Sequence, residues 1–230
     1  MSDIFSVFTF FGVAITLLGY EIGVIIKGKF KWAIFNPLLL AILFVIAFLV
    51  IFHVDYETYN EGAQYISYLM TPATVCLAIP LYQQMELLKK NAAAVLLGIL
   101  SGVLASLSGT LLLAWMFGLT HKEYVTMLPK SITTAIGIAI SEEMGGIVTI
   151  TIAAIIITGL LGNIFAETAC KIFRIEDPIA KGVAIGTASH AMGTAKAMEM
   201  GEVEGAMSSL AIAVAGLITV VGASVFAQFI

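Results

Sequence analysis

The segment 189–201, SHAMGTAKAMEMG, places a histidine, a lysine and a glutamate among Ala, Gly and Met residues. His190 could bind a substrate or carry a proton, because a histidine side chain titrates near physiological pH; packing through one hydrogen bond is the alternative. Lys196 and Glu199 are three residues apart, so on a helix they lie on one face and can pair with each other. These residue types indicate substrate binding, proton transfer or gating.

A related segment occurs earlier in the chain. TAIGIAISEEMG at 134–145 aligns with HAMGTAKAMEMG at 190–201 without gaps, so that Thr134 matches His190, and six of the twelve positions are identical. Glu143 matches Glu199 in this alignment. A position in water at an external helix end would account for the charge of Glu143, and a role in ion or proton coupling is the functional alternative. The two segments predict an internal repeat.

Hydroxyl side chains gather where we expect helices to break. KSITTA at 130–135 and TASHA at 187–191 precede runs of small residues. LMTPATVCLAIPLYQQ at 69–84 contains two prolines, each of which removes a backbone donor, so this stretch is either a third broken element or a helix that is only kinked. Helix ends at such breaks present free N–H groups to a small anion, whereas membrane helices also use Ser and Thr for packing alone. The hydroxyls concerned belong to Thr71, Thr74, Ser131, Thr133, Thr134, Ser189 and Thr194.

The composition of the chain defines its class. Of the 230 residues, 60% are hydrophobic and 11% are charged, whereas soluble domains average about 25% charged residues. The sequence therefore predicts an integral membrane protein embedded in a lipid bilayer. The net charge is −4 and there is no basic block, so we expect no nucleic-acid partner.

The sequence does not indicate chemistry beyond binding. Cys76 and Cys170 have no Cys or His partner at metal-ligand spacing, so neither a disulfide nor a metal site is expected. The usual nucleophile, zinc-hydrolase and nucleotide-binding motifs are absent from the sequence. We therefore expect no catalytic residue, no cofactor and no enzyme activity.

Long runs without Asp, Glu, Lys or Arg predict the membrane crossings. A helix needs about 20 apolar residues to cross the hydrocarbon core, and six runs of 17 to 30 residues approach or exceed that length. Two further runs, 131–141 and 182–195, have only 11 and 14 residues, a length more typical of re-entrant or interfacial segments. The six long runs are 4–20, 32–52, 62–85, 91–120, 144–166 and 205–230.

The distribution of Lys and Arg favours this interpretation. With six crossings and an external N-terminus, nine basic residues, including Lys89 and Lys90, lie on the cytoplasmic side and two, Lys122 and Lys130, lie outside, whereas eight crossings give six against five. We therefore predict an all-α polytopic membrane protein with six long transmembrane helices and two short re-entrant or broken helical segments. The predicted organisation is a single membrane domain, 1–230, with a four-span part at 1–120 and repeat units at 124–170 and 178–230.

Each predicted repeat unit contains one short segment and one crossing, so the second copy is expected to be inverted relative to the first. Inverted repeats with interrupted helices are typical of secondary transporters, whose binding sites lie near the membrane midplane where the copies meet. Irregular backbone at that depth must be buried in protein or line a watery cavity. This gives a physical reason for the polar residues of segment 189–201.

Three stretches carry a family resemblance. In this order, LMTPATVCLAIPLYQQ, LPKSITTAIGIAISEEMGG and GTASHAMGTAKAMEMGEVEGAMSSLA resemble the LrgB/CidB family of bacterial inner-membrane proteins, over residues 5–230. The resemblance implies a multi-pass protein of the bacterial cytoplasmic membrane that works with a small holin-like partner, LrgA or CidA. Bacterial members are described as antiholin-like and have been linked to small monocarboxylates such as pyruvate, and a plastid relative transports glycolate and glycerate.

Two functional hypotheses follow from the repeat and the resemblance. The first is a secondary transporter for small monocarboxylates of the glycolate, glycerate, pyruvate or lactate class; the alternative is an antiholin-like regulator of murein hydrolase activity and cell lysis without transport of its own. For the transporter, we expect the seven hydroxyls above and His190 to bind substrate, and Glu143, Lys196 and Glu199 to serve coupling or gating. The sequence leaves open the exact substrate, proton or other cation coupling, and whether the chain forms a homo-oligomer.

Overall fold

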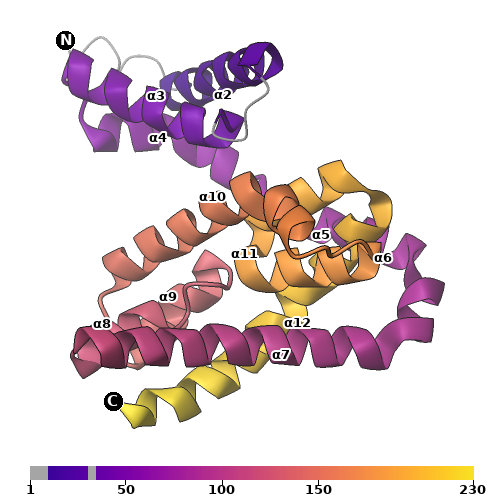
Figure 1. Cartoon of the computed structure of the whole chain (residues 1–230). Helices are drawn as coiled ribbons and strands as arrows, with labels where there is room; N and C mark the ends of the chain where they lie inside the picture. Colours follow the sequence, from indigo (N-terminus) through magenta and orange to yellow (C-terminus); the bar gives the residue numbers. More distant parts are fainter. Residues whose placement is uncertain (1–9, 31–34) are drawn as a thin grey trace. The chain divides into compact units, whose positions relative to one another are not determined.

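The structure is a computed structural model that describes residues 10–30 and 35–230. The chain divides into two compact units, of which unit 1 ends at Cys76 and unit 2 comprises Leu77–Ile230. Within the described ranges, all regular structure is helical (Figure 1). The predicted boundary at residue 120, between a four-span part and the repeat units, stays a prediction.

Unit 1 contains four described helices. Asn36 begins one of them, because its side-chain oxygen accepts hydrogen bonds from the N–H groups of Leu38 and Leu39, at 2.9 and 3.2 Å. Thr16 and Tyr59 join two others through a hydroxyl contact of 2.8 Å. The helices are α2 (Phe11–Phe30), α3 (Pro37–Phe52), α4 (Tyr56–Ser67) and α5 (Met70–Cys76).

Unit 2 contains the longest described helix, α7, with α8 and α9 near its C-terminal end (Figure 1). Thr120 begins α8 through a capping box, and its backbone and hydroxyl donors hold the pKa of the Glu123 carboxyl below its ordinary value. The elements are α6 (Ala78–Gln83), α7 (Met85–Phe117), α8 (His121–Met127), α9 (Thr134–Glu143), α10 (Val148–Ile172), α11 (Pro178–Met200), α12 (Glu202–Phe226) and the 3₁₀ helix η1 (Ala227–Phe229).

The described residues contain five helical segments long and apolar enough to cross a membrane, where the sequence predicted six. The predicted run 32–52 forms α3, whose 16 residues extend only about 24 Å, less than the roughly 30 Å hydrocarbon core. Parts of the runs 4–20 and 32–52 lie outside the described residues. The five segments are Phe11–Phe30, Tyr56–Gln83, Met85–Phe117, Val148–Ile172 and Glu202–Phe229.

The run around LMTPATVCLAIPLYQQ is divided into separate helices at its two prolines, which is the broken element of the two alternatives that the sequence left open. A proline removes the backbone donor that would bind the carbonyl four residues earlier. For Pro72 that carbonyl belongs to Tyr68, and α4 ends one residue before it; for Pro80 it belongs to Cys76, where α5 ends. The donors missing at the prolines therefore account for the separation of α4, α5 and α6.

The helix α11 folds back on itself at Ser189 and His190. His190 has φ 42° and ψ −142°, outside the helical region. Ile185 and Ala197 share one buried cluster, although twelve residues of straight helix would separate them by about 18 Å. Residues at both ends of α11 also line one cavity. We call α11 the second hairpin and 188–190 its tip.

The helices α8 and α9 form a comparable hairpin around residues 128–133. The hydroxyl of Thr151, on α10, lies 2.7 Å from the Ser141 hydroxyl and donates to the backbone carbonyl of Thr126 at 2.9 Å. Thr126 and Ser141 therefore lie side by side, although a straight helix would place them about 22 Å apart. We call residues 121–143 the first hairpin and 128–133 its tip.

The two hairpins correspond in the register of the sequence repeat, in which Thr134 matches His190. The pair Thr126 and Thr151 corresponds to Gly182 and Met207, where a Cβ added at Gly182 would lie 2.8 Å from the Met207 Cβ. The long helix after each hairpin, α10 or α12, has 25 residues. Each of the two aligned segments thus lies in a hairpin that is followed by one long helix.

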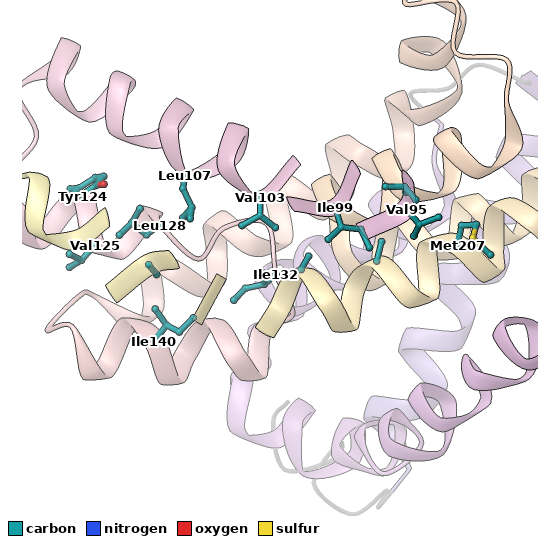
Figure 2. Packing of buried hydrophobic residues seen from close by; sticks show 14 of the residues in the cluster. Val95, Ile99, Val103, Leu107, Tyr124, Val125, Leu128, Ile132, Ile140 and Met207 are labelled. Carbon is teal, nitrogen blue, oxygen red and sulfur yellow. The ribbon is translucent and has the colours of Figure 1, made fainter. Parts of the chain in front are cut away.

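A row of apolar side chains along α7 forms the main core of unit 2 (Figure 2). Val95, Ile99, Val103 and Leu107 are spaced four residues apart, so they lie on one helix face, and all are buried. They pack against the first hairpin and α12 in one cluster. Since lipid tails are as apolar as these side chains, van der Waals packing rather than escape from water stabilises this contact.

Candidate functional site

A cavity of about 990 Å³ opens within unit 2 between α7, α10 and the two hairpins. Gly98 and Gly102 line the α7 wall and allow α11 to approach, because added Cβ atoms would lie 3.2 Å from Val183 Cγ1 and 2.6 Å from Thr187 Cγ2. Both hairpin tips reach this cavity. Its hydroxyl groups come from Ser101, Ser106, Ser131, Thr158, Thr187 and Ser189.

The tip of the first hairpin contributes a positive charge. Pro129 starts a tight turn there, in which the N–H of Ile132 donates to the Pro129 carbonyl at 3.3 Å. The Lys130 ammonium donates to Ser106 Oγ at 3.2 Å and to Ser131 Oγ at 3.1 Å. The two serine hydroxyls are 3.0 Å apart. These three groups form one connected cluster in the cavity wall.

The tip of the second hairpin is held by α10. His190 Nε2 lies 3.0 Å from the Ile155 carbonyl, so this nitrogen carries the proton and donates. The Asn163 amide donates to the Met192 carbonyl at 2.6 Å. Gly162 leaves room for Ser189, whose side chain would collide with any Cβ at that position. The tip is thereby fixed with Ser189 in the cavity wall.

Thr194 links the second hairpin to α12. Its hydroxyl donates to the His190 carbonyl at 3.0 Å and lies 2.7 Å from the Ser208 hydroxyl, and all these side chains are buried. Since lipid and packed side chains offer no water here, the Ser208 hydroxyl depends on Thr194 for a partner. This contact fixes the tip against the following long helix.

The structure brings only part of the predicted binding set together. Ser131 and Ser189, from different hairpin tips, line the same cavity. His190 and Thr194 lie at the second tip but bind α10 and α12, and neither lines the cavity.

The remaining predicted hydroxyls lie elsewhere. Thr133 and Thr134 are at the start of α9 and do not line the cavity. Thr71 belongs to α5 of unit 1, and the side chain of Thr74 lies outside the described residues. The binding roles predicted for all of these residues stay predictions.

The residues predicted for coupling or gating lie at hairpin ends. Lys196 Nζ is 3.2 Å from Glu199 Oε2 and 3.5 Å from Glu167 Oε2, so it joins the second hairpin to α10. These three residues line a second cavity of about 490 Å³, whose wall also includes Lys181. Glu143 is exposed at the end of α9. Their roles in coupling or gating stay predictions.

The cavity also contains residues that the sequence did not single out. Lys130 directly precedes Ser131 in KSITTA, yet it was counted only as an external basic residue; a lysine inside a hydroxyl-rich break was the available signal. Thr187 belongs to TASHA, a stretch that the sequence did single out, although its own hydroxyl was not named. Ser106 gave no such signal, because it lies inside the unbroken helix α7. The place of both residues in the cavity depends on which helix faces meet.

Apolar helices, two hairpins that turn back within unit 2 and a cavity between their tips that contains hydroxyl groups define a multi-pass membrane protein. The chain belongs to the LrgB-like family, whose family model matches residues 16–229. It is 41% identical over 222 residues to proteins called antiholin-like protein LrgB in Bacillus cereus (strain B4264) and Bacillus anthracis (strain A0248), with 96% of each chain covered. No solved structure matches the chain.

Proposed function

We propose that this chain is an antiholin-like membrane protein that takes part in the control of cell lysis, and that its molecular activity is the transport of small monocarboxylates. The two parts rest on different observations. The names of its relatives support the antiholin-like role more directly than they support transport. The transport activity rests on the cavity between the hairpin tips.

The observation that carries the transport proposal is the convergence of two interrupted segments on one cavity, to which both contribute polar side chains. Lys130 and Ser131 of the first tip and Ser189 of the second tip line it together. A charged side chain such as that of Lys130 is costly inside a membrane, and such residues usually mark a substrate or ion pathway. A cavity of about 990 Å³ is in the usual range for small-molecule sites, roughly 300–1,000 Å³.

We further infer that the two repeat units are inverted relative to each other. Along α10, Ile155 contacts His190 and Glu167 contacts Lys196, so α10 and the second half of α11 run in the same direction. That half runs opposite to α12, because Thr194 contacts Ser208 while a Cβ added at Gly205 would lie 2.8 Å from Met198 Cγ. The helices α10 and α12 therefore run in opposite directions (Figure 1).

Contacts exchanged between the two repeat units, both of which lie within unit 2, support the same inference. A Cβ at Gly159 of α10 would lie 2.7 Å from Met192 Sδ of the second hairpin. A Cβ at Gly216 of α12 would lie 2.9 Å from Ile136 Cδ1 of the first hairpin. In the alignment of the sequence repeat, Met192 matches Ile136, and Gly159 matches the residue next to Gly216. The two contacts are therefore nearly equivalent. Alternating access in inverted-repeat transporters uses such paired elements around one site.

In this proposal, Ser131 and Ser189 contact the substrate, and His190 and Thr194 position the second tip. The ion pair of Lys196 with Glu167 joins the base of the second hairpin to α10 and must loosen if that hairpin moves relative to α10, whereas Lys196 and Glu199 lie in the same hairpin and move together. We place the chain in the bacterial cytoplasmic membrane with a small LrgA/CidA-like membrane protein as its partner.

Transport is tested with the purified full chain in liposomes. We expect saturable uptake of labelled glycolate or pyruvate, and lower uptake by Ser189→Ala. The matched control is Ser224→Ala, because Ser224 is an exposed serine of α12 whose hydroxyl bonds its own helix. Uptake is measured with and without an inward proton gradient. Folded wild-type protein that takes up neither substrate would refute the transport activity.

The antiholin-like role is tested by the rate of autolysis of bacterial cells that lack their own LrgB-like protein. We expect wild-type chain to slow autolysis. If Ser189→Ala abolishes uptake yet slows autolysis as well as wild type, lysis control does not require transport. A wild-type chain that leaves autolysis unchanged, with and without its small partner, contradicts the antiholin-like role.

A further inference from the structure

Lys130, Ser106 and Ser131 form a triangle of polar groups in the cavity wall. The Lys130 ammonium is 3.2 Å from Ser106 Oγ and 3.1 Å from Ser131 Oγ, and the two hydroxyls are 3.0 Å apart. The side chain of Lys130 is half-buried and Ser131 is buried. The three residues come from α7 and the first hairpin tip, so tertiary packing sets their geometry.

A count of donors shows what this triangle offers to a ligand. The ammonium has three N–H donors, of which two are directed at the serine hydroxyls. Of the two hydroxyl protons, one is used in the contact between Ser106 and Ser131. One N–H and one O–H remain. Two neighbouring donors, one of them charged, match the two oxygens of a carboxylate.

The positive charge of Lys130 lacks a nearby acidic partner. The ion pairs found among the described residues involve other side chains. Asp177 lines the same cavity, but its carboxylate accepts the Ala180 N–H at the start of α11. It precedes Thr187 by ten residues, about 15 Å along a helix, and Thr187 is the α11 residue that shares a small enclosed pocket with Ser106 and Ser131.

An ammonium held in apolar surroundings by neutral hydroxyls alone is unfavourable, and an anion relieves that cost. The charge is also specific to one tip. In the register of the sequence repeat, the counterpart of Lys130 is Gly186 in the second hairpin. The two tips are therefore not equivalent, and only the first supplies a cation to the cavity.

We infer that Lys130, with Ser106 and Ser131, binds the carboxylate group of the transported monocarboxylate. The inference rests on the proposed transport activity and deepens it, because it assigns the anion-selecting residue of that site. It places the carboxylate against the first hairpin tip and leaves the rest of the substrate to face Ser189 of the second tip. Motion of one hairpin relative to the other would then change how tightly the substrate is held.

The inference is tested by direct binding of labelled glycolate to the purified full chain. Lys130→Met removes the charge and keeps much of the side-chain volume; we expect an affinity at least tenfold lower, as for loss of a charged hydrogen bond of about 1.4 kcal/mol or more. Lys130→Arg keeps the charge and should retain part of the affinity. Lys122→Met is the matched control, because Lys122 is an exposed lysine of the same hairpin.

Competition by glycolamide separates charge recognition from a structural effect. This neutral analogue of glycolate should compete poorly with glycolate in the wild-type chain, and the preference for the acid should disappear in Lys130→Met. If Lys130→Met binds glycolate as tightly as wild type, the inference is wrong while the transport proposal stands. If the wild-type chain neither binds nor transports any carboxylate, the transport proposal itself fails and the inference with it.

A second measurement uses wild-type protein and avoids the folding of variants. Reductive methylation followed by mass spectrometry reports the reactivity of each lysine. Saturating glycolate should slow the modification of Lys130 severalfold and leave that of Lys122 unchanged. Equal modification of Lys130 with and without glycolate, in protein that binds glycolate, overturns the inference.

Discussion

At the scale of single residues, two glycines of α10 determine how closely the second hairpin tip can approach. Gly162 faces Ser189, and Gly159 faces the ring of His190, where an added Cβ would lie 2.7 Å from Cε1. Both contacts occur where His190 adopts a left-handed φ of 42°, which costs energy in a residue with a side chain. The hydrogen bond from His190 to Ile155 offsets part of that cost.

Gly162→Ala is therefore expected to destabilise the fold. The new Cβ overlaps the Ser189 side chain, and forced overpacking of this kind costs about 1–3 kcal/mol. Gly109→Ala on α7 is the matched control, because no atom lies within 4 Å of a Cβ added there. Thermal unfolding in detergent should show a lower Tm for Gly162→Ala alone. Equal Tm values would mean that α10 does not restrain Ser189.

A second prediction at this scale concerns the buried hydroxyl pair of Thr194 and Ser208. Thr194→Val leaves the Ser208 hydroxyl without this partner and should lower stability. A double-mutant cycle with Ser208→Ala should give a coupling energy of about 0.6 kcal/mol, and at most about 1.7 kcal/mol, as for other hydrogen bonds between membrane helices. Additive effects of the two substitutions would show that the pair contributes nothing.

At the scale of elements, the sequence predicted where the two short segments lie better than it predicted the backbone geometry of the hairpin tips. Charge-free runs of 11 and 14 residues are too short to cross, and both lie in hairpins. The start of α11 also follows local rules, with Asp177 as cap and Pro178 next to it. The break at Ser189 and His190 contains neither Gly nor Pro, so it depends on contacts with α10 that are remote in sequence.

Water access along α11 tests whether the cavity between the hairpins is open. In a chain with Cys76 and Cys170 replaced, Ala184→Cys should react with a water-soluble thiol reagent, because Ala184 is exposed and lines the cavity. Leu161→Cys is the control: Leu161 is 50% exposed in the middle of α10 but does not line the cavity. A thiol in lipid does not ionise and reacts slowly. Similar slow reaction at both positions would mean that the cavity is closed to water.

At the scale of the whole molecule, the distribution of charge predicts which end of the cavity faces the cytoplasm. Asn91 and Asp177 line one end, next to the basic residues Lys89 and Lys90. Lys122 lies beyond the other end of α7, a helix of 33 residues and therefore about 50 Å long. The distribution of basic residues in the sequence predicts that Lys89 and Lys90 lie on the cytoplasmic side and Lys122 on the outside. The side at which the cavity opens thus depends on the positive-inside rule.

Single cysteines at these two ends test the orientation in intact cells. In the background without Cys76 and Cys170, Lys122→Cys should react with a membrane-impermeant thiol reagent in intact cells, whereas Lys90→Cys should react only after the membrane is permeabilised. In the same cells, Ala184→Cys should follow Lys90→Cys, because a cavity that ends at Asn91 and Asp177 would then open to the cytoplasm. If Ala184→Cys follows Lys122→Cys instead, the cavity faces outward and substrate first meets Lys130 from outside.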